Sequence, residues 1–198
     1  MQDQRNQGRA RLRLDHEQAV VADSVIAEDA AAQDTVFVCA SCGAALAGPL
    51  KRLPAVPEPP YYEWWEAEEM GPLPATVPSG CYAIETEPYG PPLVVAEVPE
   101  PAMPRHGTYF NVHGQPLVSQ GPRGNIVINP DDARGLELRH ASAACCGATP
   151  DGGMNQLCAC GTLVATLSSD CCLPYELHLS PGHVRALPFQ HPSPDLSA

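Results

Sequence analysis

Residues 35–46 read TVFVCASCGAAL, and this stretch decides the fold more than any other part of the chain. A β-branched and aromatic run, 35–38, leads directly into a turn that holds Cys39 and Cys42 and is closed by Gly43. Such residues favour strands, and glycine can take the left-handed conformation that a tight turn needs. The stretch therefore predicts a strand, a cysteine turn and a return strand.

A second turn of the same kind, LCACG, lies at 157–161, within a predicted hairpin. Two turns with two thiolates each supply the four soft donors that a structural zinc ion takes in a tetrahedron. The second pair is CxC, one residue shorter than the usual spacing, and is less specific than CxxC. We predict that Zn²⁺ is bound by the two pairs, Cys39, Cys42, Cys158 and Cys160. The alternative is that these are small buried side chains, as free cysteines often are.

The chain has nine cysteines, and four of the others form two doublets, Cys145-Cys146 and Cys171-Cys172. Neighbouring side chains of an extended chain point to opposite faces, so one member of each doublet can face the CxC turn. A second metal, replacement of a ligand, a disulfide between the doublets and a reactive thiol pair all remain open. Cys81 stands alone and is expected in the core.

Length and composition predict one domain. We expect a polar leader over 1–34 that is flexible or a short helix, a β-rich zinc-binding domain over 35–190, and a disordered tail over 191–198. The sequence shows neither an apolar stretch long enough for a bilayer nor a secretory signal, which predicts a cytosolic protein and no membrane partner. A reducing compartment would leave thiolates free for metal.

The charge of the chain argues against nucleic acid as a partner. The formal net charge is −12, and four of the eleven basic residues fall within the first thirteen positions. The acidic remainder would be repelled by a phosphate backbone.

Residues 49–105 are rich in proline, which rules out long helices and predicts loops and short edge strands. Within them, residues 58–69 combine five glutamates with four aromatic residues, Tyr61, Tyr62, Trp64 and Trp65. Exposed aromatics of this kind suit a protein partner. Alternatively, the rings pack over the proline-rich loops as a small satellite core.

The other predicted elements are mostly strands, so the fold class is mainly β with small α content. Alternating or β-branched runs predict strands at 82–87, 93–96, 107–112, 125–128, 154–157, 162–167 and, as the final strand, 176–179. One short helix is expected near 130–135, with Asn129 as its cap and Pro130 in the first helical position.

The layout of 36–46 and 157–167, two cysteine turns carried on strands, resembles the zinc ribbons and the related β-tent group. That group includes Yippee-like proteins, the cereblon ligand-binding domain and methionine sulfoxide reductase B. The resemblance implies a structural zinc on the same four cysteines. The neighbours of the reductases' catalytic cysteine are missing, and adjacent Trp64 and Trp65 do not form cereblon's cage. The CCG, CxCG and DC series within 146–171 also resembles actinobacterial proteins.

Two functions from different classes follow. In the first, zinc holds a β-rich module that binds a protein partner. In the second, the cluster from Cys145 to Cys172 is a thiol redox or metal-handling site, for which His140 is a candidate base. The sequence contains none of the HExxH, GxSxG, GxxxxGK or GxGxxG motifs. We therefore favour the binding module over an enzyme.

Overall fold

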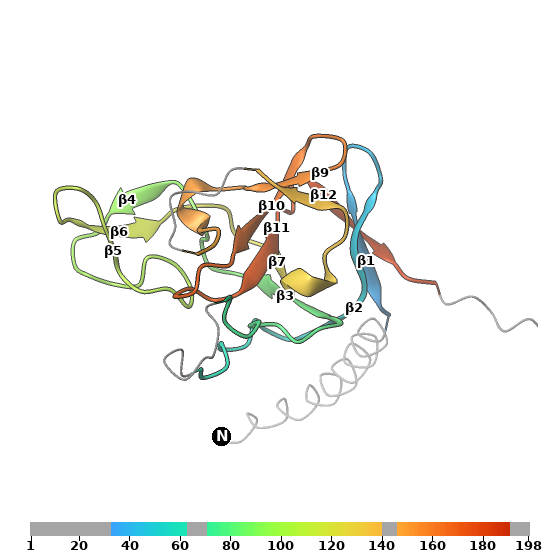
Figure 1. The fold of residues 1–198 in the computed structure, drawn as a ribbon, viewed down its shortest axis with the longest axis horizontal. Helices are drawn as coiled ribbons and strands as arrows, with labels where there is room; N and C mark the ends of the chain where they lie inside the picture. The colour runs from blue at the N-terminus through green and yellow to red at the C-terminus, as the bar shows by residue number, and fades with distance from the viewer. Residues whose placement is uncertain (1–32, 63–70, 140–145, 191–198) are drawn as a thin grey trace, which may run out of the picture. The chain divides into compact units, whose positions relative to one another are not determined.

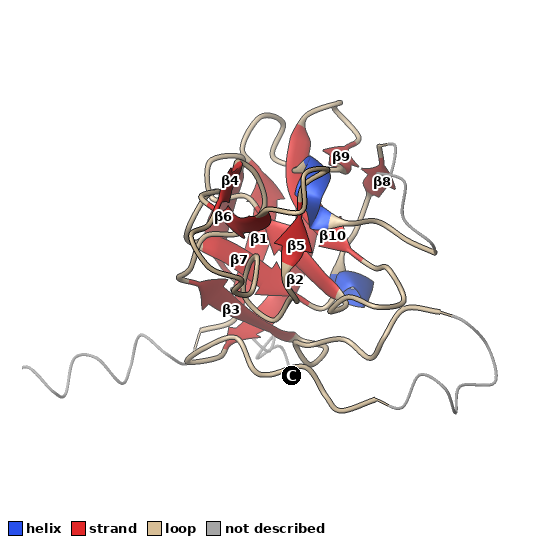
Figure 2. Cartoon of the chain, turned by 90° about the vertical axis from the view of Figure 1, so that its left-hand side faces the viewer, coloured by secondary structure: helices blue, strands red, loops and turns tan. Residues whose placement is uncertain are grey.

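A computed structural model describes residues 33–62, 71–139 and 146–190 of the chain (Figure 1). Residues 1–32 of the predicted leader, the tail, Trp64, Trp65 and the candidates Cys145 and His140 lie outside the described residues. The described part is mainly β, as predicted: strands dominate, and the helical elements in it are two short 3₁₀ turns, η3 (Pro130–Asp132) and η4 (Pro150–Gly152) (Figure 2).

The strands are β1 (Thr35–Cys39), β2 (Ala45–Arg52), β3 (Cys81–Glu85), β4 (Leu93–Val95), β5 (Tyr109–Phe110), β6 (Pro116–Ser119), β7 (Asn125–Ile128), β8 (Leu136–Leu138), β9 (Gln156–Cys158), β10 (Leu163–Ser168), β11 (Glu176–Leu179) and β12 (Val184–Pro188). Nine of them form one sheet, in the order β12-β1-β2-β3-β7-β11-β10-β9-β8, and the other three form a small sheet, β4-β6-β5. All pairs are antiparallel except β2 with β3.

The nine-stranded sheet curls until its two ends meet. Strand β1 is second in the order and β9 is eighth, yet Cys39 of β1 and Cys158 of β9 belong to the same buried core cluster. Beside that cluster, the amide of Arg134, just before β8, donates to the carbonyl of Leu46 on β2 at 2.7 Å. The concave face is filled by aliphatic side chains such as Leu177, which is 2% exposed. Burial of these side chains holds the curl.

The small sheet covers a second, smaller core. Tyr89, Ala102 and Met103 are buried there, and Leu93 and Tyr109 pack against them from β4 and β5. Of the three strands of this sheet, only β4 lies in the proline-rich region 49–105, where loops and short edge strands were predicted. β4 has three residues and pairs on one side only, with β6, as predicted. In contrast, β3 also lies in that region but is an interior strand of the nine-stranded sheet.

Three strands were not predicted: β6, β8 and β12. The prediction that 176–179 is the final strand is therefore wrong, because β12 follows it and pairs with β1 along its whole length. The sequence signal was weak since four of the five residues of β12 are exposed. Its pairing partner, which lies about 150 residues away in the chain, fixes it as a strand.

The short helix predicted near 130–135 is present as the turn η3, with Asn129 as its cap. The Asn129 side chain accepts a hydrogen bond from the Asp131 amide at 3.0 Å. The turn ends at Asp132, earlier than predicted, because Ala133 forms a β-bridge with Ala47. This bridge places Ala133 beside β2, so the helical segment does not extend beyond one 3₁₀ turn.

Candidate metal centre

The first cysteine turn extends from the end of β1. The amide of Cys39 donates to the carbonyl of Ala44 at 2.8 Å, and the amide of Gly43 returns to the carbonyl of Cys39 at 2.9 Å. Gly43 has a φ of 77°, the left-handed conformation expected from the sequence. The turn is also tied to the loop between β11 and β12, since the Ala40 amide donates to the His183 carbonyl at 2.9 Å.

The second turn repeats this design with one residue fewer. The amide of Cys158, at the end of β9, donates to the carbonyl of Thr162 at 2.9 Å, and the amide of Gly161 donates to the carbonyl of Cys158 at 2.8 Å. Gly161 has a φ of 83°. The shorter CxC spacing thus closes a turn of the same kind. In both turns, the two sulfurs lie close to each other.

The two turns bring all four predicted ligands together. Their Sγ atoms lie within 4.8 Å of one another. Across the two turns, Cys39 Sγ is 3.8 Å from Cys160 Sγ, and Cys42 Sγ is 3.6 Å from Cys158 Sγ. Four sulfurs about 2.3 Å from one ion in a tetrahedron would be about 3.8 Å apart. The four cysteines are unbridged and can hold a metal ion.

Each turn contributes one buried and one exposed sulfur. Cys39 and Cys158 are buried and belong to the hydrophobic core, whereas Cys42 and Cys160 are exposed. A metal ion here would therefore sit where the core reaches the surface. The alternative that all four are simply small buried residues does not fit, because two of them face solvent.

The pKa values of Cys39, Cys158 and Cys160 are shifted in different directions. Hydrogen bonds from the hydroxyl and then the amide of Thr162 lower the pKa of Cys160 to about 6. The Cys160 amide favours the Cys158 thiolate, but burial and the neighbouring thiols outweigh it and raise the pKa of Cys158 to about 12. Burial opposes ionisation of Cys39, but the amides of Cys42 and Ser41 lower its pKa. Four thiolates this close need a cation to balance their charge, which a divalent metal ion supplies.

One of the alternatives left open for the doublets is realised. Cys146 and Cys171 form a disulfide, with their Cα atoms 6.0 Å apart. Cys172 is a free, exposed thiol. Cys81, predicted in the core, is only half-buried at the start of β3. The doublets do not replace any ligand of the four-cysteine group among the described residues.

Of the predicted partner residues, Tyr61 and Tyr62 are in the described part of the chain. Their exposed fractions are 82% and 38%. Within the same part, no helix is long and apolar enough to cross a membrane. The cytosolic location stays a prediction.

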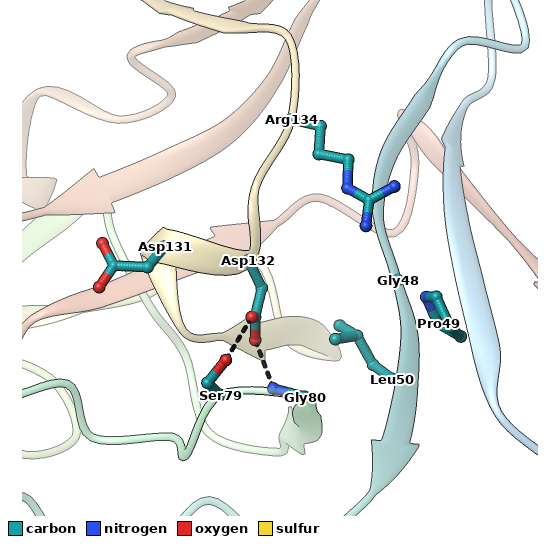
Figure 3. A pocket seen from close by; sticks show the side chains of 8 residues that line it. All are labelled: Gly48, Pro49, Leu50, Ser79, Gly80, Asp131, Asp132 and Arg134. Atoms are coloured by element: carbon teal, nitrogen blue, oxygen red, sulfur yellow. Dashed lines mark hydrogen bonds between the residues drawn. The ribbon is translucent and has the colours of Figure 1, made fainter.

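A pocket of about 200 Å³, which none of the four candidate ligands lines, lies between β2, the turn at 79–80 and η3 (Figure 3). Figure 3 shows Asp132 turned toward Ser79 and Gly80, from which its carboxylate accepts hydrogen bonds of 2.6 and 2.8 Å. Asp131 points elsewhere and accepts from the hydroxyl of Tyr175 at 3.0 Å. The two aspartates are thus used separately, as structural acceptors, and do not form a carboxylate pair.

Comparison of the chain with protein-family models, with curated proteins and with solved structures gave no match. The resemblance to zinc ribbons and the β-tent group stays a prediction. The function is therefore inferred from the geometry of the described sites alone.

Proposed function

We propose that this protein binds one structural Zn²⁺ through Cys39, Cys42, Cys158 and Cys160, and that the ion holds the curled sheet closed. The separations of 3.6 and 3.8 Å between sulfurs of different turns carry this proposal. They are too long for disulfides and match the edges of a zinc–thiolate tetrahedron.

The donor set favours zinc and a structural role. Tetrahedral four-thiolate sites select Zn²⁺ or iron, and zinc suits a site that has no redox function. Four protein ligands leave no open position for water or substrate, which separates structural from catalytic zinc sites. Cys39 and Cys158 end β1 and β9, and Cys42 and Cys160 lie in the turns that follow, so the ion links β1 and β2 to β9 and β10.

The β-rich domain held in this way is proposed to bind a protein partner through the segment that carries Tyr61, Tyr62, Trp64 and Trp65. The exposure of Tyr61 and Tyr62 supports this and argues against their packing as a satellite core. The net charge of −12 favours a basic protein surface over nucleic acid as the partner.

The test is the metal content of protein purified without chelator, measured by elemental mass spectrometry. We expect one zinc per chain in the unaltered protein and in the matched control Cys81→Ser, and none in Cys39→Ser or Cys160→Ser. Because metal-binding free energy is also folding free energy, the ligand variants should unfold.

Cobalt substitution separates a lost ligand from a lost fold. The unaltered protein loaded with Co²⁺ should show the visible absorption of tetrahedral thiolate coordination. Absence of that absorption in folded protein, or retention of full zinc content by both ligand variants, would show that the four-cysteine assignment is wrong.

A further inference from the structure

Three cysteines outside the metal centre meet at one point of the surface. Cys146 and Cys171 are joined by a disulfide across 25 residues of chain, and Cys172 Sγ lies 3.9 Å from Cys171 Sγ. A free sulfur thus stands next to a disulfide, almost in van der Waals contact. These three residues are separate from the four proposed zinc ligands.

The carboxylate of Asp170 holds the three cysteines in this arrangement. One of its oxygens accepts from the amide of Cys146, and the other from the amide of Cys172, both at 3.2 Å. Asp170 is itself buried, with 7% of its surface exposed, so the surrounding protein holds its carboxylate in place. The same carboxylate therefore ties both doublets, although they lie far apart in the sequence.

The outer two sulfurs are open to reagents. Cys146 and Cys172 are exposed, whereas Cys171 is half-buried between them. A solute can reach the free thiol and the outer end of the disulfide, but it reaches the middle sulfur less easily. The middle sulfur is the one that Cys172 approaches.

We propose that Cys146, Cys171 and Cys172 form a thiol–disulfide exchange centre whose substrates are low-molecular-weight disulfides. The Cys172 thiol releases its proton to water, and the resulting thiolate attacks Cys171 Sγ. A Cys171–Cys172 bond forms, the Cys146–Cys171 bond breaks, and the electron pair leaves on Cys146 as a thiolate. This step has no net oxidation, so it needs no outside oxidant.

The released Cys146 thiolate then reacts with a small disulfide, RSSR. It attacks one sulfur, forms the mixed disulfide Cys146–S–S–R and expels RS⁻, which takes up a proton from water. A disulfide between sequence neighbours closes a small, strained ring, so at rest the exchange favours Cys146–Cys171. A small disulfide therefore drives the exchange by trapping Cys146.

The predicted cytosolic location agrees with this chemistry. Disulfides of cytosolic proteins are more often catalytic or redox-sensing than structural. The competing use of the same atoms is a second metal site, because Cys146, Asp170 and Cys171 offer ligand atoms within 4.8 Å of one another. The disulfide occupies both sulfurs, and metal content therefore distinguishes the two uses.

The experiment treats zinc-loaded, full-length protein with oxidised glutathione in the absence of reductant, followed by acid quenching and peptide mapping by tandem mass spectrometry. In the unaltered protein we expect glutathione on Cys172 in one population and on Cys146 in another, the latter together with a Cys171–Cys172 disulfide. In Cys172→Ser, glutathione on Cys146 should fall at least tenfold, because a disulfide without an attacking thiolate does not react with another disulfide.

Cys145→Ser and Cys81→Ser are the matched controls, since each replaces a different cysteine and should leave the labelling of Cys146 unchanged. Equal labelling of Cys146 in Cys172→Ser, loss of it in Cys145→Ser, or its absence from the unaltered protein would overturn the proposal. So would a second metal ion per chain in place of the disulfide. Zinc is measured in the same samples, so failure of the four-cysteine site is read separately.

Discussion

At the scale of single residues, glycines decide how closely the cysteine-bearing segments approach. A Cβ on Gly147 would collide with the carbonyl oxygen of Ser169 and lie 2.8 Å from the amide nitrogen of Asp170. Gly147 follows Cys146, and Asp170 precedes Cys171, so this contact lies at the disulfide. Only glycine lets the two backbones approach in this way.

We predict that Gly147→Ala destabilises the protein by about 1–3 kcal/mol, the usual cost of overpacking. Gly107→Ala is the matched control, because a Cβ there meets nothing within 4 Å and should change stability by less than about 1 kcal/mol. Urea unfolding at saturating zinc measures both. Equal effects of the two substitutions would show that the close contact at Gly147 does not contribute to the free energy of unfolding.

At the scale of elements, a buried ion cluster joins the loop at 102–107 to β3 and β11. Arg105 donates to Glu85 of β3 at 2.7 Å and to Glu176 of β11 at 2.6 and 3.0 Å, and His178 contacts Glu176 at 2.7 Å. These side chains are at most 8% exposed. Arg105 has a φ of 63°, uncommon for a bulky residue, and its ion pairs hold it there.

Removing the cation from this cluster should be costly. We predict that Arg105→Leu lowers the free energy of unfolding by about 3–5 kcal/mol, because the buried carboxylates of Glu85 and Glu176 lose the arginine that balances their charge. In contrast, Arg123→Leu breaks an ion pair with Glu87 whose side chains are 59% and 63% exposed, and should cost about 0–1 kcal/mol. Denaturant titration of both variants tests this difference, and similar losses would contradict it.

The same cluster predicts a pH dependence. Burial opposes ionisation of Glu176, but His178 and Arg105 outweigh it and hold its pKa far below the usual value of 4.5. The unfolded chain therefore takes up a proton near pH 4.5 that the folded protein does not. Stability from Glu176 is complete above that pH and is lost as the pH falls toward the folded-state pKa, at about 1.4 kcal/mol per pH unit.

Glu176→Gln removes this titrating group and nearly keeps its shape. Unfolding experiments between pH 5 and pH 3 should show a shallower decline for the variant than for the unaltered protein, by up to one proton. An unchanged slope would mean that Glu176 is not ionised within the folded protein.

At the scale of the whole molecule, the proposed metal ion joins parts that are remote in both the sequence and the sheet order. Cys39 and Cys160 are 121 residues apart, and β1 and β9, which lead into the two cysteine turns, are separated by five other strands of the nine-stranded sheet. The curl is also held by the bridge between Ala47 and Ala133 and by the common core. We call this line of contacts between the two ends of the curled sheet the seam. The metal ion would close the seam at the two cysteine turns.

Chelation should therefore loosen the seam first. After zinc is removed, we predict faster hydrogen exchange at the amides of Gly43 and Gly161, which bond to the first cysteine of each turn. Strand β7, which is fully buried near the middle of the sheet, should keep its protection longest. Mass spectrometry with and without added Zn²⁺ measures this order, and identical exchange in both states would show that no metal holds the seam.

Local sequence predicted the strands with a clear hydrophobic pattern and the four candidate ligands, since strand, turn and cysteine spacing are properties of a few neighbouring residues. The two turns are recognisable because each has its own glycine and its own apolar lead-in. In contrast, β8 and β12 carry mostly exposed residues and are strands only because of their partners. Their pattern alone resembles that of a loop.

By itself, the sequence determined a mainly β chain with two cysteine turns suited to a metal ion. Only the tertiary structure decided that the turns meet, that Cys146 pairs with Cys171, and that Cys172 remains a free thiol beside them. The physical reason is that the meeting of the turns and the pairing of Cys146 with Cys171 join residues between 25 and 121 positions apart. They depend on how the whole sheet curls and packs its core, which no short stretch of sequence encodes.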